Sequence, residues 1–374
     1  MSPTKFVPVL VLSTILAACG GGAPAPVSSS PTTPSTAAST KPAASTAAPA
    51  SASAKPAGSA AASGKPAASG AAATTGKVQT AYSEIYNGQV PIWVAQDAGL
   101  FKQAGVDVDQ TYIASSNVIA AVVSGQVPIA QGGGPEAMSA AAGGADLMLI
   151  GNVVPYYPYI LYVSKDINSI NDLKGKKLGV SSHGSASDIA TRVALKKEGL
   201  DPDKDVSIIT VGSSTNRTAA LQSGAIQGGV DQPPSSYLLE KQGLHPLINL
   251  AELKLPTVNN GIIVQGAWLK SHRTEAQKYI DGVVMGIARA KKDRAYAAQE
   301  LAKYMKLDNN DDIKRAVDYG ADNLWASQPT IKKEDFADAI DVLSQTNPNI
   351  KNFDVSKILD NSLVESAVQR GLDK

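Results

Sequence analysis

The folded part of the chain starts where branched apolar residues begin to recur. From Val78 onward, short apolar runs alternate with longer segments whose apolar residues recur every three or four positions. The short runs are typical of β-strands and the longer segments of amphipathic helices. The pattern predicts strands at residues 79–85, 106–112, 127–131, 146–151, 159–164, 177–181, 206–211, 227–231 and 260–265, with a mainly helical C-terminal part. This alternation indicates an α/β fold with largely parallel sheets.

Two helices are defined by their apolar faces. Pro91 fits the first turn of a helix that ends near Gly105. Its inward residues are predicted to be Val90, Trp93, Val94 and Phe101. A C-terminal helix carries one apolar stripe, formed by Ile280, Val283, Val284, Ile287 and Ala288.

An internal repeat points to two similar lobes. Residues 120–127 and 219–226 share the pattern Ala-Ala-x-x-Ser-Gly. In each copy a helix is predicted to end at Ser-Gly, and a short strand then runs into a loop rich in Gly or Pro. Two such lobes would place these loops on opposite walls of one cleft, because ligands of open α/β sheets bind beyond the carboxyl ends of the strands. If the repeat is only chance similarity, the fold class stays the same.

The N-terminus has the layout of a secretory signal. Lys5 is followed by the mostly apolar run 6–16, which is too short to span a bilayer as a mature helix. Residues 16–19 read Leu-Ala-Ala-Cys, which resembles the bacterial lipobox. The resemblance implies that residues 1–18 are removed and that Cys19 carries a lipid on the extracytoplasmic side of a membrane. The alternative is a secreted protein with an incidental cysteine.

The next segment, residues 19–77, is predicted to be a disordered tether behind the lipidated Cys19. From Gly20 to Lys77 it consists of Ala, Ser, Thr, Pro, Gly and Lys, apart from Val27. This composition offers too little apolar surface to form a core.

Charge and cysteine content exclude several classes of function. All 33 acidic residues follow residue 77, whereas five lysines precede Val78, so the predicted folded part is mildly acidic. Nucleic acid is therefore not an expected partner. The single cysteine, Cys19, leaves no cysteine nucleophile, disulfide or cysteine-based zinc site in the folded part, where we expect no metal.

Four motifs carry a family resemblance. They are Ile92–Val108, Ser124–Ile129, Asp172–Val180 and Ala219–Gly224. In this order, the sequence resembles the nitrate/sulfonate/taurine and thiamine-pyrimidine (SsuA-like) group of substrate-binding proteins of ABC importers. The resemblance implies a two-lobed periplasmic-binding-protein fold of type II. Lobe one would comprise residues 78–163 and 258–374, lobe two would comprise 164–257, and the crossing segments would lie near 161–165 and 258–264.

The resemblance also implies a function. A lipid-anchored, monomeric protein would capture a small organic solute, anionic or heterocyclic, in the cleft and deliver it to an ABC permease and its ATPase. One alternative is an enzyme like those that make the thiamine pyrimidine, although such relatives carry a cysteine-rich motif that this chain lacks. Another is a ligand-sensing accessory lipoprotein.

Motifs for enzymatic chemistry are weak. The Gly-x-Ser-x-Gly elbow is absent, so Ser182 and His183 do not indicate a serine hydrolase. Residues 132–137 fit the Gly-x-Gly-x-x-Ala fingerprint, but no acidic residue follows in a suitable strand about 20 residues on. We therefore predict no enzymatic activity and no cofactor.

The strongest candidate for ligand binding is the turn at residues 181–188. It follows a predicted strand and opens a helix, and Ser185 with Asp188 fits a capping box. Free N–H groups at a helix start can bind a carboxylate, sulfonate or phosphate oxygen. In the resembled family the equivalent turn contributes ligand contacts. The alternative is an ordinary capped helix with an exposed His183.

The remaining candidates lie mostly where predicted strands end or cross. The predicted ligand-binding residues are Tyr86, Asn87, Ser115, Ser116, Gly134, Tyr156, Ser182, His183, Ser185, Asp231, Gln232 and Asn260. Arg217 is the one basic residue in the candidate loops of lobe two, whereas Asp231 and Glu136 bring negative charge. This balance disfavours nitrate or a simple sulfonate as the solute.

Overall fold

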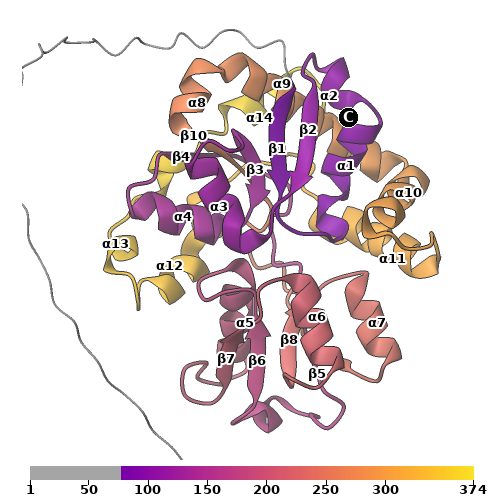
Figure 1. Cartoon of the computed structure of the whole chain (residues 1–374), viewed down its shortest axis with the longest axis vertical. Helices are drawn as coiled ribbons and strands as arrows, with labels where there is room; N and C mark the ends of the chain where they lie inside the picture. Colours follow the sequence, from indigo (N-terminus) through magenta and orange to yellow (C-terminus); the bar gives the residue numbers. More distant parts are fainter. Residues whose placement is uncertain (1–76) are drawn as a thin grey trace, which may run out of the picture. The chain divides into compact units, whose positions relative to one another are not determined.

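The computed structural model describes residues 77–374, which form two lobes with one five-stranded sheet each (Figure 1). The predicted signal peptide, Cys19 and the tether up to Gly76 lie outside the described residues. The expected α/β architecture is confirmed, because strands alternate with helices in both lobes.

The sheet of lobe one has the strand order β2-β1-β3-β10-β4. Its strands are β1 (Val78–Tyr82), β2 (Val108–Tyr112), β3 (Ile129–Gly132), β4 (Leu147–Asn152) and β10 (Gly261–Gln265). β1 pairs in parallel with β2 and β3, whereas β10 runs antiparallel to β3 and β4. Side chains along β10 alternate between two cores, since Ile262 and Val264 belong to one cluster and Ile263 to the other.

The sheet of lobe two repeats this arrangement with the order β7-β6-β8-β5-β9. Its strands are β5 (Ile160–Val163), β6 (Lys177–Val180), β7 (Ser207–Thr210), β8 (Gly228–Asp231) and β9 (His245–Asn249). β6 pairs in parallel with β7 and β8, and β5 runs antiparallel to β8 and β9. β9 was not predicted from the sequence, because Pro246 interrupts its short apolar pattern.

The sequence repeat corresponds to one structural unit in each lobe. The helices α3 (Ser115–Val123) and α6 (Ser214–Gln222) both end at the repeated serine. The following glycines, Gly125 and Gly224, have φ values of 77° and 74°, which favour glycine. Each unit then enters the central strand of its sheet, β3 or β8. The predicted duplication of the helix–strand turn is therefore confirmed.

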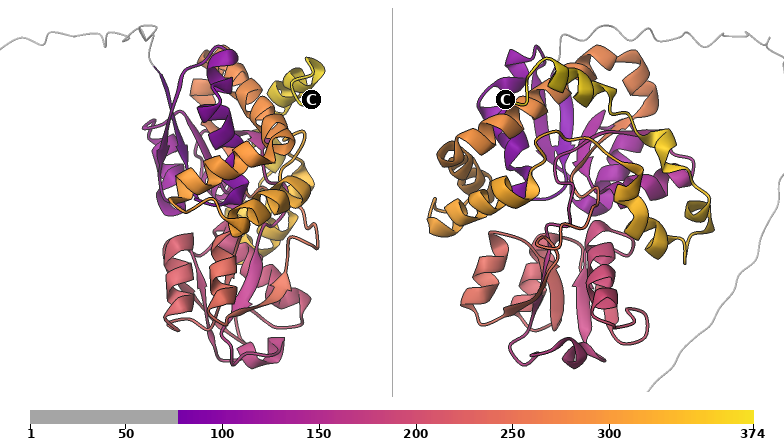
Figure 2. Two further views of the ribbon diagram at one scale, coloured as in Figure 1. Left: turned by 90° about the vertical axis from the view of Figure 1, so that its right-hand side faces the viewer. Right: turned by 180° about the vertical axis from the view of Figure 1, so that it is seen from behind.

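Helices cover both faces of each sheet (Figures 1 and 2). Between the strands lie α1 (Val90–Asp97), α2 (Leu100–Gln103), α3, α4 (Gly134–Ala142), α5 (Ala186–Lys197), α6 and α7 (Ser235–Lys241). The C-terminal helices are α8 (Gly266–Ser271), α9 (Arg273–Lys292), α10 (Arg294–Met305), α11 (Asp311–Tyr319), α12 (Ala337–Leu343), α13 (Pro348–Lys351) and α14 (Ser362–Gln369). Short 3-10 turns occupy Asn87–Gln89, Ile170–Leu173, Lys333–Phe336 and Val355–Ile358, and a π-turn occupies Gly320–Leu324.

Two details of the predicted helices differ in the structure. The helix expected from Pro91 to about Gly105 is divided into α1 and α2, because Gly99 adopts a φ of 71° between them. In α9, four of the five stripe residues are fully buried, whereas Ala288 is only partly buried.

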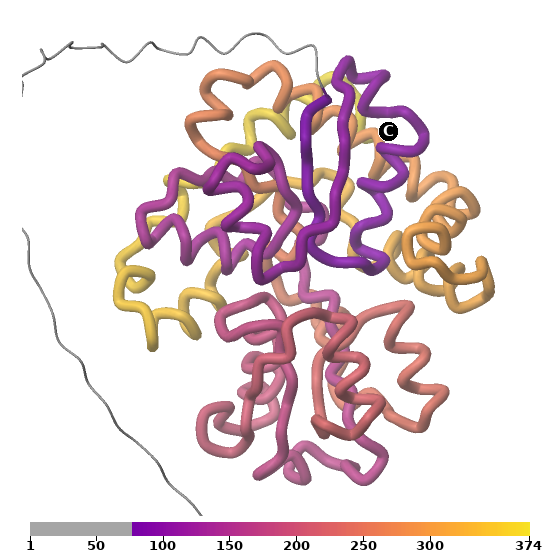
Figure 3. Tube along the Cα trace, viewed as in Figure 1, coloured from indigo at the N-terminus to yellow at the C-terminus, as the bar shows by residue number. Residues whose placement is uncertain are grey.

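Two segments, residues 153–159 and 250–260, connect the lobes (Figures 2 and 3). They run side by side in opposite directions and are joined by backbone hydrogen bonds, such as Thr257 N–H to the Pro155 carbonyl at 2.9 Å. The crossings expected near 161–165 and 258–264 are therefore displaced by several residues. β5 belongs to the second sheet and β10 to the first, so the expected boundary after residue 163 lies on the wrong side of β5.

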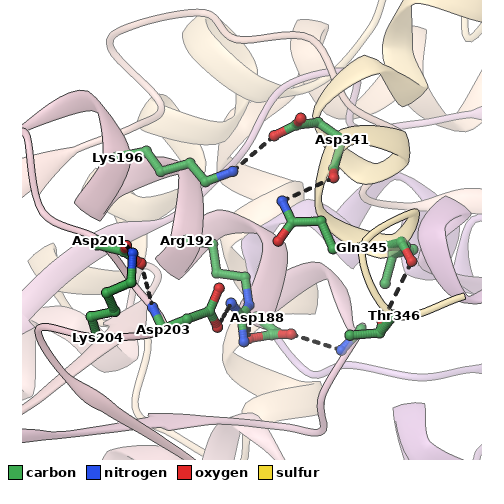
Figure 4. A network of polar contacts seen from close by, with 11 residues as sticks. Asp188, Arg192, Lys196, Asp201, Asp203, Lys204, Asp341, Gln345 and Thr346 are labelled. Carbon is green, nitrogen blue, oxygen red and sulfur yellow. Dashed lines mark hydrogen bonds and ion pairs between the residues drawn. The ribbon is translucent and has the colours of Figure 1, made fainter.

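Two C-terminal helices of lobe one also contact lobe two. Lys196 on α5 forms an ion pair with Asp341 on α12 at 2.8 Å (Figure 4), and Lys241 on α7 pairs with Asp312 on α11. α12 also contributes Leu343 to an apolar cluster that includes residues of α5. Lobe two is thus held by α11 and α12 as well as by the two crossing segments.

The packing of α9 against α1 gives a test of the fold. A Cβ atom added to Gly286 would lie 2.4 Å from the Pro91 carbonyl oxygen and 2.7 Å from Ala95 Cβ. We expect Gly286→Ala to lower the free energy of unfolding by about 1–3 kcal/mol, because the backbone of α1 must move. Urea unfolding measures this change. Lys292→Ala, at an exposed position of the same helix, should stay within about 0.5 kcal/mol of the wild type. An equally stable Gly286→Ala protein would contradict this packing.

Candidate functional site

Polar residues of both lobes meet where the parallel strands end. Glu84 follows β1 and Gln232 follows β8, and Gln232 Nε2 donates a hydrogen bond to the Glu84 carboxylate at 3.1 Å. Beside them, Asn87 N–H donates to the Pro233 carbonyl at 3.4 Å. The carboxyl ends of strands are the usual ligand-binding edge of open α/β sheets. The junction of the lobes is therefore the candidate site.

A buried guanidinium lies on the lobe-two side of this junction. Arg217 on α6 is fully buried, its Nη1 donates to Ser181 Oγ at 3.0 Å, and its Nε donates to the Val230 carbonyl. Asp231, at the end of β8, is also buried and accepts hydrogen bonds from Thr218 Oγ1 at 2.6 Å and from its neighbour's backbone N–H at 2.7 Å. Both groups are fixed by lobe two itself.

A second contact between the lobes involves Glu136 on α4. Its Oε1 accepts a hydrogen bond from the backbone N–H of Ala186, the first residue of α5, at 3.2 Å. A carboxylate at this position is stabilised by the partial positive charge of the helix start. Glu136 belongs to lobe one and α5 to lobe two, so this hydrogen bond forms only when the lobes are together.

The buried carboxyl groups of Glu84, Asp231 and Glu136 each have a pKa above the ordinary value. Burial raises the pKa of Glu84 and Asp231, and the nearby Arg217 guanidinium partly opposes the shift in both. Burial raises the pKa of Glu136 to about 7, against the opposing effect of its backbone hydrogen bonds. The negative charges of Glu84 and Asp188 add to the shift at Glu136. The junction therefore disfavours further negative charge.

The turn predicted as an anion site is satisfied by the chain's own groups. Ser185 caps α5 as expected, with its Oγ accepting from Asp188 N–H at 3.4 Å. The Asp188 carboxylate accepts from Gly184 N–H at 2.8 Å and pairs with Arg192 at 3.0 Å (Figure 4). The first N–H of the helix is bonded to Glu136. These donors are thus already used in the structure.

Two cavities open between the lobes on either side of these contacts. The first, of about 480 Å³, is lined by four predicted residues, Ser115, Ser116, Ser182 and His183, together with Glu136, Asp188 and α12 residues. The second, of about 610 Å³, is lined by the predicted residues Asp231 and Gln232 together with Thr218 and residues of α7, α10 and α11. Six of the predicted residues therefore line cavities at the junction.

Other predicted residues support the walls or lie apart. Tyr86 is buried and its hydroxyl accepts from Asn259 Nδ2 at 3.0 Å, whereas Asn260 Nδ2 donates to Gln89 Oε1 at 3.0 Å. Gly134 allows close approach to the second crossing segment, since an added Cβ would lie 2.4 Å from Val258 Cβ. Tyr156 is elsewhere and faces the Lys254 ammonium and a separate cavity beside Trp325.

Several residues at the junction were absent from the predicted set, among them Glu84, Glu136, Tyr159, Arg217 and Asn259. Glu84 had a usable signal, because it comes two residues after β1 at the ligand-binding edge. Tyr159 is fully buried, and its pKa is raised by burial and by the nearby charge of Glu84, while the nearby Arg217 opposes the shift. The contact of Arg217 with Ser181 joins residues far apart in sequence, which no local pattern indicates.

Among residues 77–374, no three His, Cys, Asp or Glu side chains are grouped so that they could hold a metal ion. Within the same residues, no helix is both long enough and apolar enough to cross a membrane.

The two lobes, their matching sheets and the polar junction define the periplasmic-binding-protein fold. The chain belongs to the NMT1/THI5-like family, whose family model matches residues 87–297. The expected resemblance to substrate-binding proteins of this group is thereby confirmed.

The chain is also similar to one curated protein sequence, and two solved structures share its fold. YtlA of Bacillus subtilis (strain 168) is 24% identical over 199 residues, which cover 52% of this chain and 60% of YtlA. A solved structure from Bordetella bronchiseptica RB50 has a TM-score of 0.67 and 24% identity, covering 79% of this chain and 98% of that protein. The alkanesulfonate-binding protein SsuA from Xanthomonas axonopodis pv. citri, bound to MOPS, has a TM-score of 0.64 and 18% identity, covering 76% and 98%.

The raised pKa of Glu136 predicts a pH effect on stability. Between its ordinary pKa of 4.5 and its folded pKa of about 7, the folded state binds more protons at Glu136 than the unfolded state does. The contribution of Glu136 to the free energy of unfolding should therefore fall as the pH rises through this window. Chemical unfolding at pH 4.5 to 7.5 of wild type and Glu136→Gln measures it.

The difference in unfolding free energy, wild type minus variant, should decrease across this range and level off above it. Glu334→Gln makes the same chemical change at an exposed position and should give a flat difference. A flat difference for Glu136→Gln as well would show that the Glu136 carboxyl is not held in this environment.

Proposed function

We propose that the protein is an extracytoplasmic solute-binding protein that closes two lobes over a small organic solute and delivers it to an ABC permease. The observation that carries the proposal is the polar junction, where groups at the strand ends of both lobes meet around two cavities. Membership of the NMT1/THI5-like family and the likeness to SsuA support it.

The proposed mechanism is a shift between open and closed forms. A solute that contacts both walls stabilises the closed form, whereas a solute with no preference for closure changes nothing. Contacts between the lobes, such as Glu136 with Ala186 and Gln232 with Glu84, belong to the closed form. The two crossing segments provide the hinge. The permease and its ATPase would then recognise the closed form.

The envelope location belongs to the same proposal. Residues 1–18 would be a signal peptide, Cys19 the lipid-bearing first residue, and the following residues up to Lys77 a tether that lets a monomeric binding domain reach the permease. In this proposal the protein catalyses no reaction, in contrast to the thiamine-pyrimidine enzymes. It delivers its solute to a transporter and does not act as a ligand-sensing accessory lipoprotein.

Closure over a solute can be measured by hydrogen exchange. A metabolite extract of the host, added to the purified full chain, should slow amide exchange in the loops after β1 and β3 of lobe one and after β6 and β8 of lobe two together. At about one hundred times the Kd, the solute adds roughly 2.7 kcal/mol of stability, or a few degrees in Tm. The amides of α14 serve as the internal control. Protection confined to one lobe, or no protection, would refute a binding site between the lobes.

The anchor can be tested independently. The intact mass of the membrane-fraction protein should correspond to a chain that begins at Cys19 and carries a diacylglycerol group. Cys19→Ser should leave the membrane fraction, whereas Ser13→Ala, a change within the apolar run, should not. A mature protein that begins elsewhere, or a Cys19→Ser protein still in the membrane fraction, would rule out the lipid anchor.

A further inference from the structure

The junction contains buried acceptors that lack hydrogen-bond partners. Gln232 Oε1 and Asn259 Oδ1 have none, although both residues are at least 94% buried, and Glu136 Oε2 is also buried without a partner. A buried acceptor without a partner has lost its hydrogen bonds to water and has gained none in exchange. Such atoms therefore mark positions where a bound molecule could donate N–H or O–H groups.

The orientation of the Gln232 amide is fixed by its partner. Its Nε2 donates to the carboxylate of Glu84 at 3.1 Å, and a carboxylate only accepts, so the unpartnered atom must be the oxygen. Gln232 also lines the second cavity, together with Asp231. The unpartnered groups of this junction include one pure donor, Arg217 Nη2. Most of the unpartnered atoms at the junction can therefore accept a hydrogen bond.

The lining of the first cavity also contains more acidic groups than guanidinium groups. Its lining contains the carboxyl groups of Glu136, Asp188 and Asp203 and one guanidinium, Arg192. Arg192 is already paired with Asp188 at 3.0 Å and with Asp203 at 2.6 Å. Glu136 lines this cavity beside the start of α5, and its Oε2 has no partner, although Arg192 and His183 belong to the same lining.

Glu136 also removes the feature that would attract an anion. The start of α5 is the part of the junction best suited to a sulfonate or carboxylate, because helix starts carry partial positive charge. Its first N–H is bonded to Glu136 Oε1 at 3.2 Å, so the protein's own carboxylate occupies that position. An anionic solute would have to displace the Glu136 carboxyl group from that position.

We infer that the solute is a cation rich in N–H donors, such as an amine, amidine or guanidine, and that Glu136 is the residue that determines this charge preference. The inference rests on the proposed function, since it names the solute class of the same junction. The cation would bind in the first cavity, donate to Glu136 Oε2 and balance the carboxyl groups that line this cavity.

A panel of probes tests the inference on the full chain. Thermal unfolding is followed with agmatine, putrescine and benzamidine and, at equal ionic strength, with ethanesulfonate, acetate and nitrate. The cations should raise the Tm of the wild type, and the anions should not. Glu136→Gln should weaken the binding of the cations about tenfold or more, because a charge-assisted hydrogen bond is lost. Glu334→Gln, at an exposed site, should bind like the wild type.

Glu136→Ala provides the reverse test. It frees the Ala186 N–H, so ethanesulfonate should stabilise this variant at concentrations that leave the wild type unchanged. The inference is overturned if an anion stabilises the wild type at lower concentration than every cation, if no cation acts up to 20 mM, or if Glu136→Gln leaves cation binding unchanged. If an anion binds the wild type and slows amide exchange in both lobes, the proposed function is retained and only the inference of a cationic solute fails. If neither the panel nor a host extract binds, the proposed function is contradicted as well.

Discussion

The structure depends on the exclusion of water from charged groups at the junction of the lobes. Arg217 is fully buried, and Asp231 and Glu84 lie beside it without a direct ion pair to the guanidinium. Removing such groups from water costs several kcal/mol each, and partial compensation comes from hydrogen bonds and from nearby opposite charge. Arg217 and Asp231 obtain those hydrogen bonds within lobe two. Glu84 and Glu136, in lobe one, obtain theirs partly from lobe two.

This division leaves some hydrogen-bonding groups at the junction without a partner. Ion pairs and apolar contacts of α11 and α12 also join the lobes, yet several acceptors at the junction have no hydrogen-bond partner. In an open form, water would solvate these same atoms. In the proposed mechanism, closure without a solute forms a few hydrogen bonds but removes water from these atoms. A bound molecule that supplies the missing donors makes the free energy of closure more favourable. The arrangement of the two lobes would then depend on whether a solute is bound.

The sequence predicted the fold well because each strand carries its own local signal. Runs such as 146–151 and 177–181 are apolar and bounded by turn residues, so they were found with small errors in their ends. The assignment of β5 to a lobe failed because its four apolar residues fit either sheet equally well, and only pairing with β8 and β9 decides. β9 carried little pattern at all, with Pro246 in its centre.

The site was less accessible to sequence reasoning. Ser182 and Gln232, which line the two cavities, could be predicted as candidates because they follow strands, and the rule about strand ends is general. Glu84 was missed because the first strand was expected to continue to Ile85, which placed Glu84 inside it. The partner of Glu136 lies 50 residues away on another lobe. Such distant partners decide which N–H donors of the turn before α5 remain free. The local sequence motif could therefore not show that these donors already have partners.

The two ion pairs of α11 and α12 link lobe two to lobe one outside the crossing segments. Lys196–Asp341 and Lys241–Asp312 join different helices of lobe two to different helices of lobe one, on the sides of the two cavities. A movement of lobe two away from α11 and α12 would break both pairs. Exposed pairs of this kind contribute only about 0–1 kcal/mol each. They therefore join the lobes at two points and add little to the free energy needed to separate them.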